Sequence, residues 1–139
     1  MASQIPVSQD ELKDILFKNN LVKEDDWLDA MDNAHRRRRG VEEVLIERGF
    51  FDIRYLYELI GDYLKIPYVN LRKRKLDPVV LDELDERVVH ATRAIPFALE
   101  KGRLKVAMVD PKDKEKLDLL KKSIKKKADI FITSYKNFL

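Results

Sequence analysis

Residues 45–71, LIERGFFDIRYLYELIGDYLKIPYVNL, contain two apolar helical stretches separated by Gly49, and they end in a proline and a short β-prone run. Glycine is well tolerated in the left-handed conformation that follows a helix end. Asp52 is a favourable N-cap for the second stretch, in which apolar residues recur at helical spacing. The stretch therefore predicts two short helices joined by a sharp turn, and a change of structure after Pro67.

A similar pattern lies 29 residues earlier in the chain. Residues 15–31, ILFKNNLVKEDDWLDAM, align with residues 44–60, VLIERGFFDIRYLYELI, and their apolar positions coincide. Asn20 aligns with Gly49, and asparagine is the other residue type that commonly adopts the left-handed conformation beyond a helix. The repetition at a fixed offset predicts a duplicated unit of helix, tight turn and helix.

The helix ends carry further signals. Ser8 and Glu11 have the Ser-x-x-Glu spacing of a capping box, whereas Lys23 stands in the first repeat where Asp52 stands in the second, so that helix begins less cleanly. Gly40 is expected to end the second helix. Neither two-helix unit can bury its apolar stripe alone, so residues 1–66 are predicted to form a four-helix subdomain of two repeated helical hairpins.

The second part of the chain, residues 67–139, predicts a small α+β subdomain with a mainly antiparallel sheet. The segment AIPFALEKGRLKVAMV, residues 94–109, has the pattern of a β-hairpin that turns at Lys101 and Gly102. Asp-Pro pairs favour helix starts because proline fits the first helical position. The remaining expected elements are short strands at residues 68–71 and 128–133, helices that begin at Asp77 and Asp110, and a helix that begins after Ser134.

Composition restricts the class of protein. The chain has 139 residues, no cysteine and only two histidines, which argues against a disulfide framework or a structural zinc site. It contains neither a secretory signal nor an apolar run long enough to span a bilayer, so a cytoplasmic location is expected. The net charge of +3 divides into −4 for residues 1–66 and +7 for residues 67–139. Such a division indicates two subdomains with different surfaces.

These features together resemble the N-terminal domain of type II secretion and type IV pilus assembly ATPases, the MshE type. The matching stretches are VLIERGFFDIRYLYELIGDYLKIPYVNL, residues 44–71, and AIPFALEKGRLKVAMVDPKD, residues 94–113. They occur in the family's order over nearly the whole chain. The resemblance implies a domain that docks an ATPase onto an inner-membrane platform protein or regulates that ATPase.

No enzymatic activity is expected from this chain. It has no G-x-x-x-x-G-K-[ST] sequence that could bind nucleotide phosphates as a P-loop does, and no cysteine nucleophile. The ATPase core implied by the resemblance would therefore lie beyond Leu139 in the same polypeptide or in a separate protein. The short helix start after Ser134 favours the first arrangement. We expect no cofactor, and attachment to the inner face of the inner membrane through a partner.

Some members of this family bind cyclic di-GMP through two copies of a 24-residue motif in which arginine, glycine and glutamine contact the ligand. The resemblance places Glu11, Lys13 and Ala34 at these positions in the first repeat, and Gly40, Glu42 and Tyr63 in the second. The leucine positions of the framework are largely kept. Arg39, one residue before the second motif, is the available ligand-binding residue. Cyclic di-GMP sensing is therefore the alternative function.

Two groups of residues are candidates for partner binding. The first is the run of Arg36, Arg37, Arg38 and Arg39, which could pair with an acidic partner surface or simply complement the end of a helix. The second is Phe50 and Phe51, which close the helical core unless one of them is exposed as an interface anchor. Basic residues 72–75 and 112–127 alternate with acidic ones or lack a recognition motif, so nucleic acid is an unlikely partner.

Overall fold

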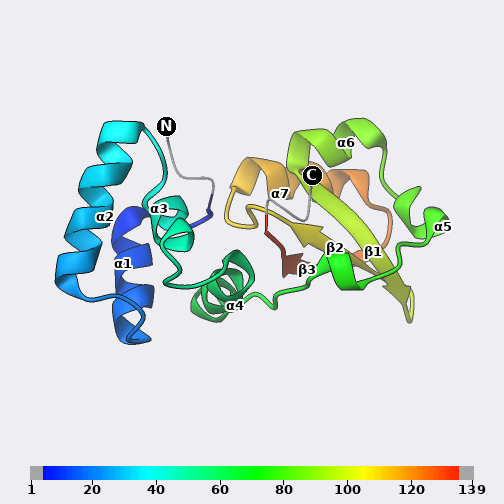
Figure 1. The fold of residues 1–139 in the computed structure, drawn as a ribbon. Coiled ribbons are helices and arrows are strands. Elements are labelled where there is room, and N and C mark those ends of the chain that lie inside the picture. The colour runs from blue at the N-terminus through cyan, green and yellow to red at the C-terminus, as the bar shows by residue number, and fades with distance from the viewer. Residues whose placement is uncertain (1–4, 135–139) are drawn as a thin grey trace.

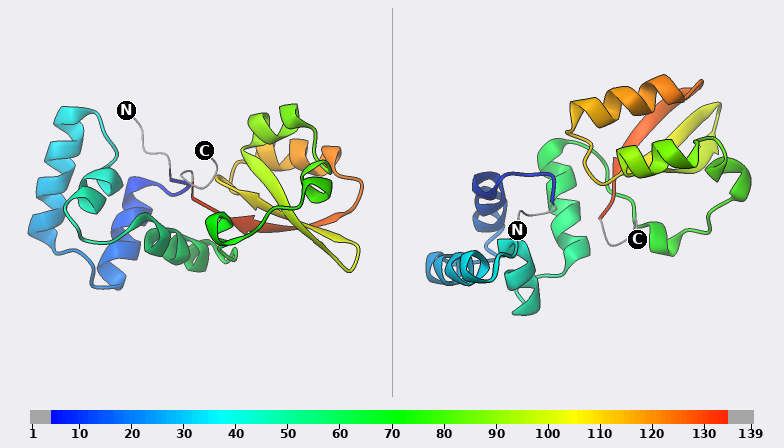
Figure 2. Two further views of the ribbon diagram at one scale, coloured as in Figure 1. Left: turned by 45° about the vertical axis from the view of Figure 1, so that its right-hand side comes forward. Right: turned by 90° about the horizontal axis from the view of Figure 1, so that it is seen from above.

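The computed structural model describes residues 5–134. A helical half and a sheet half lie side by side, and α4 runs between them (Figures 1 and 2). The elements are α1 (Gln9–Lys18), α2 (Glu24–Arg37), α3 (Val41–Glu47), α4 (Ile53–Leu64), the 3-10 turn η1 (Leu71–Lys73), α5 (Pro78–Leu81), α6 (Glu86–Thr92), β1 (Ala94–Glu100), β2 (Arg103–Met108), α7 (Lys114–Ser123) and β3 (Lys127–Ile132). The predicted α+β class is confirmed.

The two helical hairpins have the same turn, as the repeat predicts. Asn20 and Gly49 follow α1 and α3 with φ angles of 55° and 83°. The backbone N–H of Leu21 donates to the carbonyl of Leu16 at 3.0 Å, and the corresponding bond of the second hairpin, 29 residues later, measures 3.1 Å. These bonds satisfy carbonyls that the helix end would otherwise leave unpaired.

The helix starts also follow the sequence signals. The Ser8 hydroxyl accepts from the backbone N–H of Glu11 at 3.1 Å, and the Glu11 carboxylate accepts from the N–H of Ser8 at 2.9 Å, which completes the capping box. Asp52 accepts from the N–H of Tyr55 at 2.8 Å at the start of α4. Lys23 provides no side-chain cap for α2, as expected.

The four helices enclose one apolar core. Trp27 of α2 is 2% exposed and meets the ring of Phe17 edge-on, with 6.3 Å between the ring centroids. Apolar residues at equivalent positions of the two repeats are buried together, so each hairpin covers the stripe of the other. The most deeply buried are Leu12, Leu16, Leu45, Leu56, Tyr57 and Ile60.

The turn between the hairpins differs from the prediction. α2 ends at Arg37, and Arg38 rather than Gly40 adopts the left-handed conformation, with φ of 53°. Gly40 is instead the N-cap of α3, with φ of −71°. A Cβ atom at residue 40 would lie 2.5 Å from the carboxylate oxygens of Glu42, so a larger residue there would require this buried side chain to shift.

The sheet half is built on the predicted hairpin. β1 and β2 pair antiparallel up to Glu100 and Arg103, and the turn residues Lys101 and Gly102 have φ angles of 52° and 75°. Positive φ at both positions is typical of a type I′ turn, which suits the twist of the strands. β3 joins β2 in parallel, so the strand order is β1-β2-β3.

The two faces of the sheet have different coverings. α6 and α7 lie over one face (Figure 1), where Leu104, Val106 and Met108 of β2 pack with Leu120 of α7. The other face, which we call the second sheet face, holds Phe97, Ala107 and Phe131 and is partly covered by the segment that contains Val69 and Leu71.

Three expectations for the sheet half need correction, and a fourth is not tested. Residues 68–71 form only an isolated bridge from Tyr68 to β3. α5 ends at Leu81, and a separate helix, α6, follows it. α7 begins after Asp113 and not after Asp110, because the Asp113 carboxylate accepts from the N–H of Lys116 at 3.2 Å and caps the helix there. The helix expected after Ser134 lies outside the described residues.

The halves are joined through the end of β3. The N–H of Ile132 donates to the carbonyl of Pro67 at 2.8 Å, and the N–H of Val69 donates to the carbonyl of Ile132 at 2.9 Å. The Ile132 side chain, fully buried, belongs to the helical core. Gly61 of α4 makes room for it, since a Cβ atom there would lie 3.3 Å from Ile132 Cγ2 and 2.6 Å from the carbonyl oxygen of Ile66.

Replacing Gly49 by alanine tests the left-handed turn. A Cβ atom at residue 49 would meet no heavy atom within 4 Å, so any loss reports backbone strain and not a clash. We expect Gly49→Ala to lower the free energy of unfolding by about 1–2 kcal/mol in urea denaturation. Asn20→Gly, the matched change at the equivalent turn, should leave it unchanged or raise it. Equal losses in both variants would contradict the assignment.

Candidate functional site

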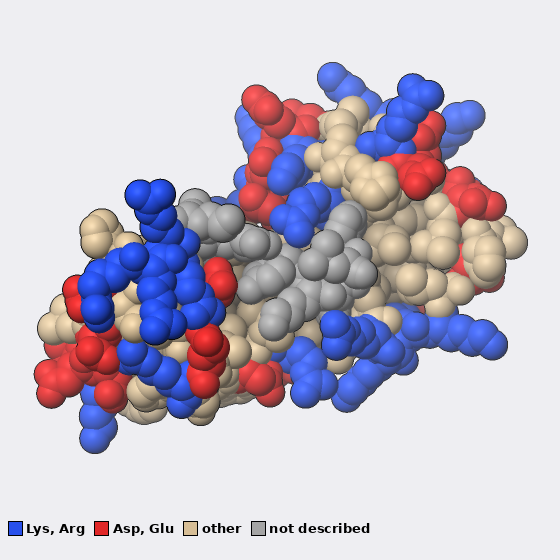
Figure 3. Space-filling model, turned by 45° about the horizontal axis from the view of Figure 1, so that its top comes forward, with Lys and Arg blue, Asp and Glu red and all other residues tan. Residues whose placement is uncertain are grey.

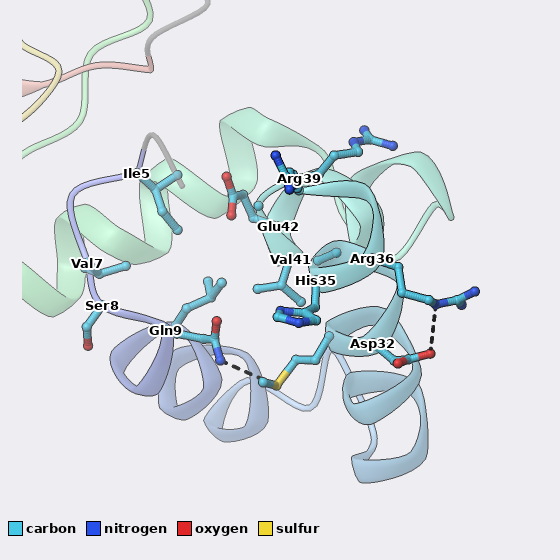
Figure 4. A pocket seen from close by; sticks show the side chains of 15 residues that line it. Ile5, Val7, Ser8, Gln9, Asp32, His35, Arg36, Arg39, Val41 and Glu42 are labelled. Atoms are coloured by element: carbon cyan, nitrogen blue, oxygen red, sulfur yellow. Dashed lines mark hydrogen bonds and ion pairs between the residues drawn. The ribbon is translucent and has the colours of Figure 1, made fainter. Parts of the chain in front are cut away.

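A pocket of about 1000 Å³ lies where the two repeats meet, and we call it the repeat pocket. It is bounded by the chain entering α1, by the end of α2 and by the start of α3 (Figure 4). Its lining is mixed: apolar residues lie beside arginines and one buried glutamate. The residues are Ile5, Val7, Ser8, Gln9, Leu12, Met31, Asp32, Ala34, His35, Arg36, Arg38, Arg39, Gly40, Val41 and Glu42.

The four consecutive arginines, of which Arg36, Arg38 and Arg39 line the pocket, have different surroundings. Arg36 pairs with Asp32 one turn earlier in α2 at 3.2 Å. Arg39 pairs with Glu43 at 3.7 Å and also with Glu47 of α3, and it is less exposed than the other three. Arg37 and Arg38 are exposed and form no ion pair within residues 5–134. Two of the four guanidinium groups are therefore available to an acidic partner.

Glu42 closes the inner wall of the pocket. Its side chain has no exposed surface, and its carboxylate lies directly against Gly40. In the family's motif this position is a glycine, through which the backbone approaches a ligand closely. Here the carboxylate fills the space that such an approach would need, and it places a carboxyl group where an anionic ligand would have to lie.

The equivalent positions of the first repeat are also engaged within the chain. Glu11, at the motif's arginine position, caps α1 and lies 3.4 Å from Nζ of Lys112, which precedes α7. Lys13, at the motif's glycine position, lies 3.5 Å from Glu24 and has its ammonium 5.2 Å from the centroid of the Phe17 ring. These side chains bind the repeat's own helices and the sheet half together.

Tyr63 completes this arrangement from α4. Its hydroxyl lies near enough to the Glu11 carboxylate for each group to shift the pKa of the other, although sequence reasoning placed the two residues only at separate motif positions. The backbone N–H of Ser8 lowers the pKa of the Glu11 carboxyl, and Lys112 and Tyr63 act in the same direction. Partial burial and the nearby Glu11 carboxylate raise the pKa of the Tyr63 hydroxyl. No sequence signal links Glu11 to Lys112, because the two lie 101 residues apart.

The two phenylalanines do not join the arginines. Phe51 is 9% exposed and belongs to the helical core, and Phe50 is half-buried against it. They follow α3, whereas the arginines precede it. Of the two readings of the sequence, the structure fits the one in which the pair closes the helical core, because neither ring is exposed. Phe51→Ala would remove core packing and would not report on a partner contact.

Other kinds of site were sought in the described part of the chain. No group of three or more His, Asp or Glu side chains within residues 5–134 is placed to hold a metal ion. Among the same residues, no helix combines the length and apolar character that crossing a bilayer requires.

Duplicated helical hairpins joined to a small mixed sheet define a compact α+β module with its candidate site between the repeats. The chain belongs to the MshEN domain family, whose sequence profile matches residues 64–139. This confirms the family predicted from the two matching stretches. The type IV pilus assembly ATPase PilB of Thermus thermophilus is 27% identical over 113 residues, which cover 80% of this chain and 13% of that protein.

Solved structures show the same fold. A structure of MshE with cdg, 23% identical, superposes with a TM-score of 0.70 and covers 91% of this chain and 92% of that one. The N-terminal domain of XpsE, 16% identical, superposes with a TM-score of 0.59 and covers 99% and 92% of the two chains. The chain spans 13% of the length of the PilB protein that it matches.

The Glu11 arrangement predicts a pH dependence. A carboxyl whose pKa is lowered by folding contributes stability above its unfolded pKa of about 4.3, and the contribution disappears as the pH falls through the lower, folded value. Glu11→Gln, which can keep the capping box but removes the charge that faces Lys112 and the helix N-terminus, should lower the free energy of unfolding by about 0.5 kcal/mol at pH 7, with the difference from wild type shrinking below pH 4. Thermal melts between pH 7 and 3 measure this. Asp10→Asn is the control, and an identical pH profile for both variants would refute the role of Glu11.

Proposed function

We propose that this chain is the non-catalytic docking and regulatory domain of a type II secretion or type IV pilus assembly ATPase system. Its partner would be a cytoplasmic domain of the inner-membrane platform protein, and the ATPase core would be supplied in cis or in trans. Membership of the MshEN family and likeness to PilB and XpsE support the ATPase system. The domain would act in the cytoplasm, held at the membrane by its partner.

One observation favours docking over sensing of a nucleotide. The positions that hold the ligand in the cyclic di-GMP motif are occupied by Glu11, Lys13 and Glu42, and each of these is used for contacts within the chain. A ligand would have to break the α1 capping box or displace a buried carboxylate. In this proposal the packed helices of the repeats hold in place a surface that binds a protein partner.

The available arginines are the proposed contact with the partner. Arg37 and Arg38 project from the turn between the hairpins and have no acidic partner in the described chain, so an acidic surface could pair with them without breaking an internal contact. Arg36 and Arg39 would add positive charge to this surface while they stay paired with the carboxylates of α2 and α3. Blue side chains at the end of the helical half in Figure 3 show how strongly basic residues gather there.

We propose that residues 1–66 and 67–139 are two subdomains, and that binding of a partner to the first changes the position of the second. The described contacts between them include the burial of Ile132 and Val109 in the helical core and the Glu11–Lys112 pair. A partner bound at the arginine turn could therefore bias the position of the sheet half, and through it an ATPase core that follows or binds there.

Binding to the platform protein tests this proposal. Purified cytoplasmic domains of type II secretion and type IV pilus platform proteins would be titrated against the 139-residue chain. Arg37→Gln combined with Arg38→Gln should weaken binding about tenfold, which corresponds to roughly 1.4 kcal/mol. Lys18→Gln combined with Lys23→Gln, an equal loss of charge elsewhere on the helical half, should not. Absence of binding to any platform domain would reject the proposal.

Cyclic di-GMP binding is the second candidate, because the fold superposes on MshE with cdg and arginines line the repeat pocket. The engagement of Arg39 by two glutamates argues against it. Calorimetry with cyclic di-GMP should give no saturable heat at micromolar concentrations. A micromolar dissociation constant that Arg39→Ala abolishes would establish sensing in place of docking.

A further inference from the structure

The second sheet face carries a set of basic side chains that the proposed docking turn does not use. Arg103 and Lys105 of β2 alternate toward this face, as do Lys127 and Asp129 of β3. Arg74, from the segment that partly covers the face, has its guanidinium 4.8 Å from the centroid of the Phe97 ring. We call Arg74, Arg103, Lys105 and Lys127 the basic sheet face.

Two of these four cations, Arg74 and Lys105, lie over aromatic rings. Phe97 and Phe131 meet edge-on with 5.1 Å between their centroids. The ammonium of Lys105 lies 5.6 Å from the centroid of Phe131, just as Arg74 lies over Phe97. A cation held against a ring loses less conformational freedom when a ligand binds, so the charges are preorganised.

The strand register places like charges opposite each other. Arg103 and Lys127 are direct partners in the β2–β3 ladder, an arrangement that destabilises a sheet. Asp129 relieves only one of them: it accepts from Nε of Arg103 at 3.0 Å and from Nη2 at 2.7 Å. Lys127 is exposed and has no ion pair among the described residues. A pair of like charges that lowers stability, with no compensating contact nearby, is typical of a binding site.

The charge balance of this surface is strongly positive. Its acidic residues are Asp129, which pairs with Arg103, and Glu100, which lies 3.1 Å from Lys105. The exposed residues 72, 73 and 75 add three cations that form no ion pair within residues 5–134. Figure 3 shows Lys and Arg side chains along the lower edge of the sheet half.

We infer that the basic sheet face binds an extended acidic segment of a protein partner, with its carboxylates on Lys127 and on the cations held over the two rings. The rings are covered by the chain's own Arg74 and Lys105, so they are not open for stacking by nucleic acid bases, which disfavours that ligand. The inference rests on the proposed docking function and adds a second contact for the partner, separate from the arginine turn.

The test uses the 139-residue chain and a peptide of alternating Glu and Thr, followed by amide chemical shifts and fluorescence anisotropy. Shifts should concentrate on β2, β3 and residues 72–75, and a peptide of alternating Gln and Thr should not bind. Arg74→Gln combined with Lys105→Gln should weaken binding at least fivefold. Lys121→Gln combined with Lys122→Gln, the same charge change on α7, should leave it within twofold. Equal losses in both pairs, or shifts over α7, would overturn the inference.

Lys127→Gln separates binding from structure. Removing the charge opposite Arg103 should raise the melting temperature and weaken binding of the peptide at least threefold. A variant that is more stable and binds equally well would overturn the inference, as would a single-stranded oligodeoxynucleotide that binds more tightly than the peptide with the same shifts.

The platform domains distinguish this inference from the proposed function. If they bind wild type and the Arg74/Lys105 variant equally, the second contact is wrong and the docking function stands. If they bind neither, the docking function fails, and the peptide titration alone decides whether the basic sheet face is a binding surface.

Discussion

Ile132 joins the helical half to the sheet half. Its backbone belongs to the sheet, where it exchanges hydrogen bonds with Pro67 and Val69, and its side chain is buried in the helical core. Gly61 leaves room for that side chain against α4, since a Cβ atom there would lie 3.3 Å from Ile132 Cγ2. The two halves therefore share buried surface, which is costly to separate in water. A domain that passes a partner's binding to an ATPase core needs such a connection, because a flexible linker would not transmit a change of position.

Side chains at the positions of the cyclic di-GMP motif also make contacts within the chain. Glu11 connects the start of α1 to Lys112 and to Tyr63, so it fixes the helical half against the sheet half. The Glu42 carboxylate is buried and fills the space beside Gly40. Residues at ligand-binding positions of the motif thus strengthen internal contacts in this chain. The repeats keep the fold of the similar structures, while the side chains at the motif positions make contacts within the chain.

Local signals in the sequence predicted local structure well. The left-handed turns at Asn20 and Gly49 and the hairpin turn at Lys101 follow from backbone preferences of the residues themselves. Gly40 was misread because its role depends on the Glu42 side chain, which no propensity reveals. Alternation in β3 showed which residues share a face, but it could not show that β3 lies parallel to β2. The contact of Glu11 with Lys112 could not be predicted, since only the folded chain brings the two together.

The uneven charge of the two halves has a structural explanation. In the helical half, acidic residues of α2 and α3 neutralise Arg36 and Arg39, so only part of its basic run is available. In the sheet half the basic residues stand on alternate positions of neighbouring strands, where Asp129 can serve only one of them. Charge that is neutralised locally contributes to stability, whereas charge that is kept in excess on a fixed surface raises the energy of the free protein. The acidic segment proposed above would relieve that excess by supplying carboxylates, so the basic sheet face has more to gain from such binding than the repeat pocket.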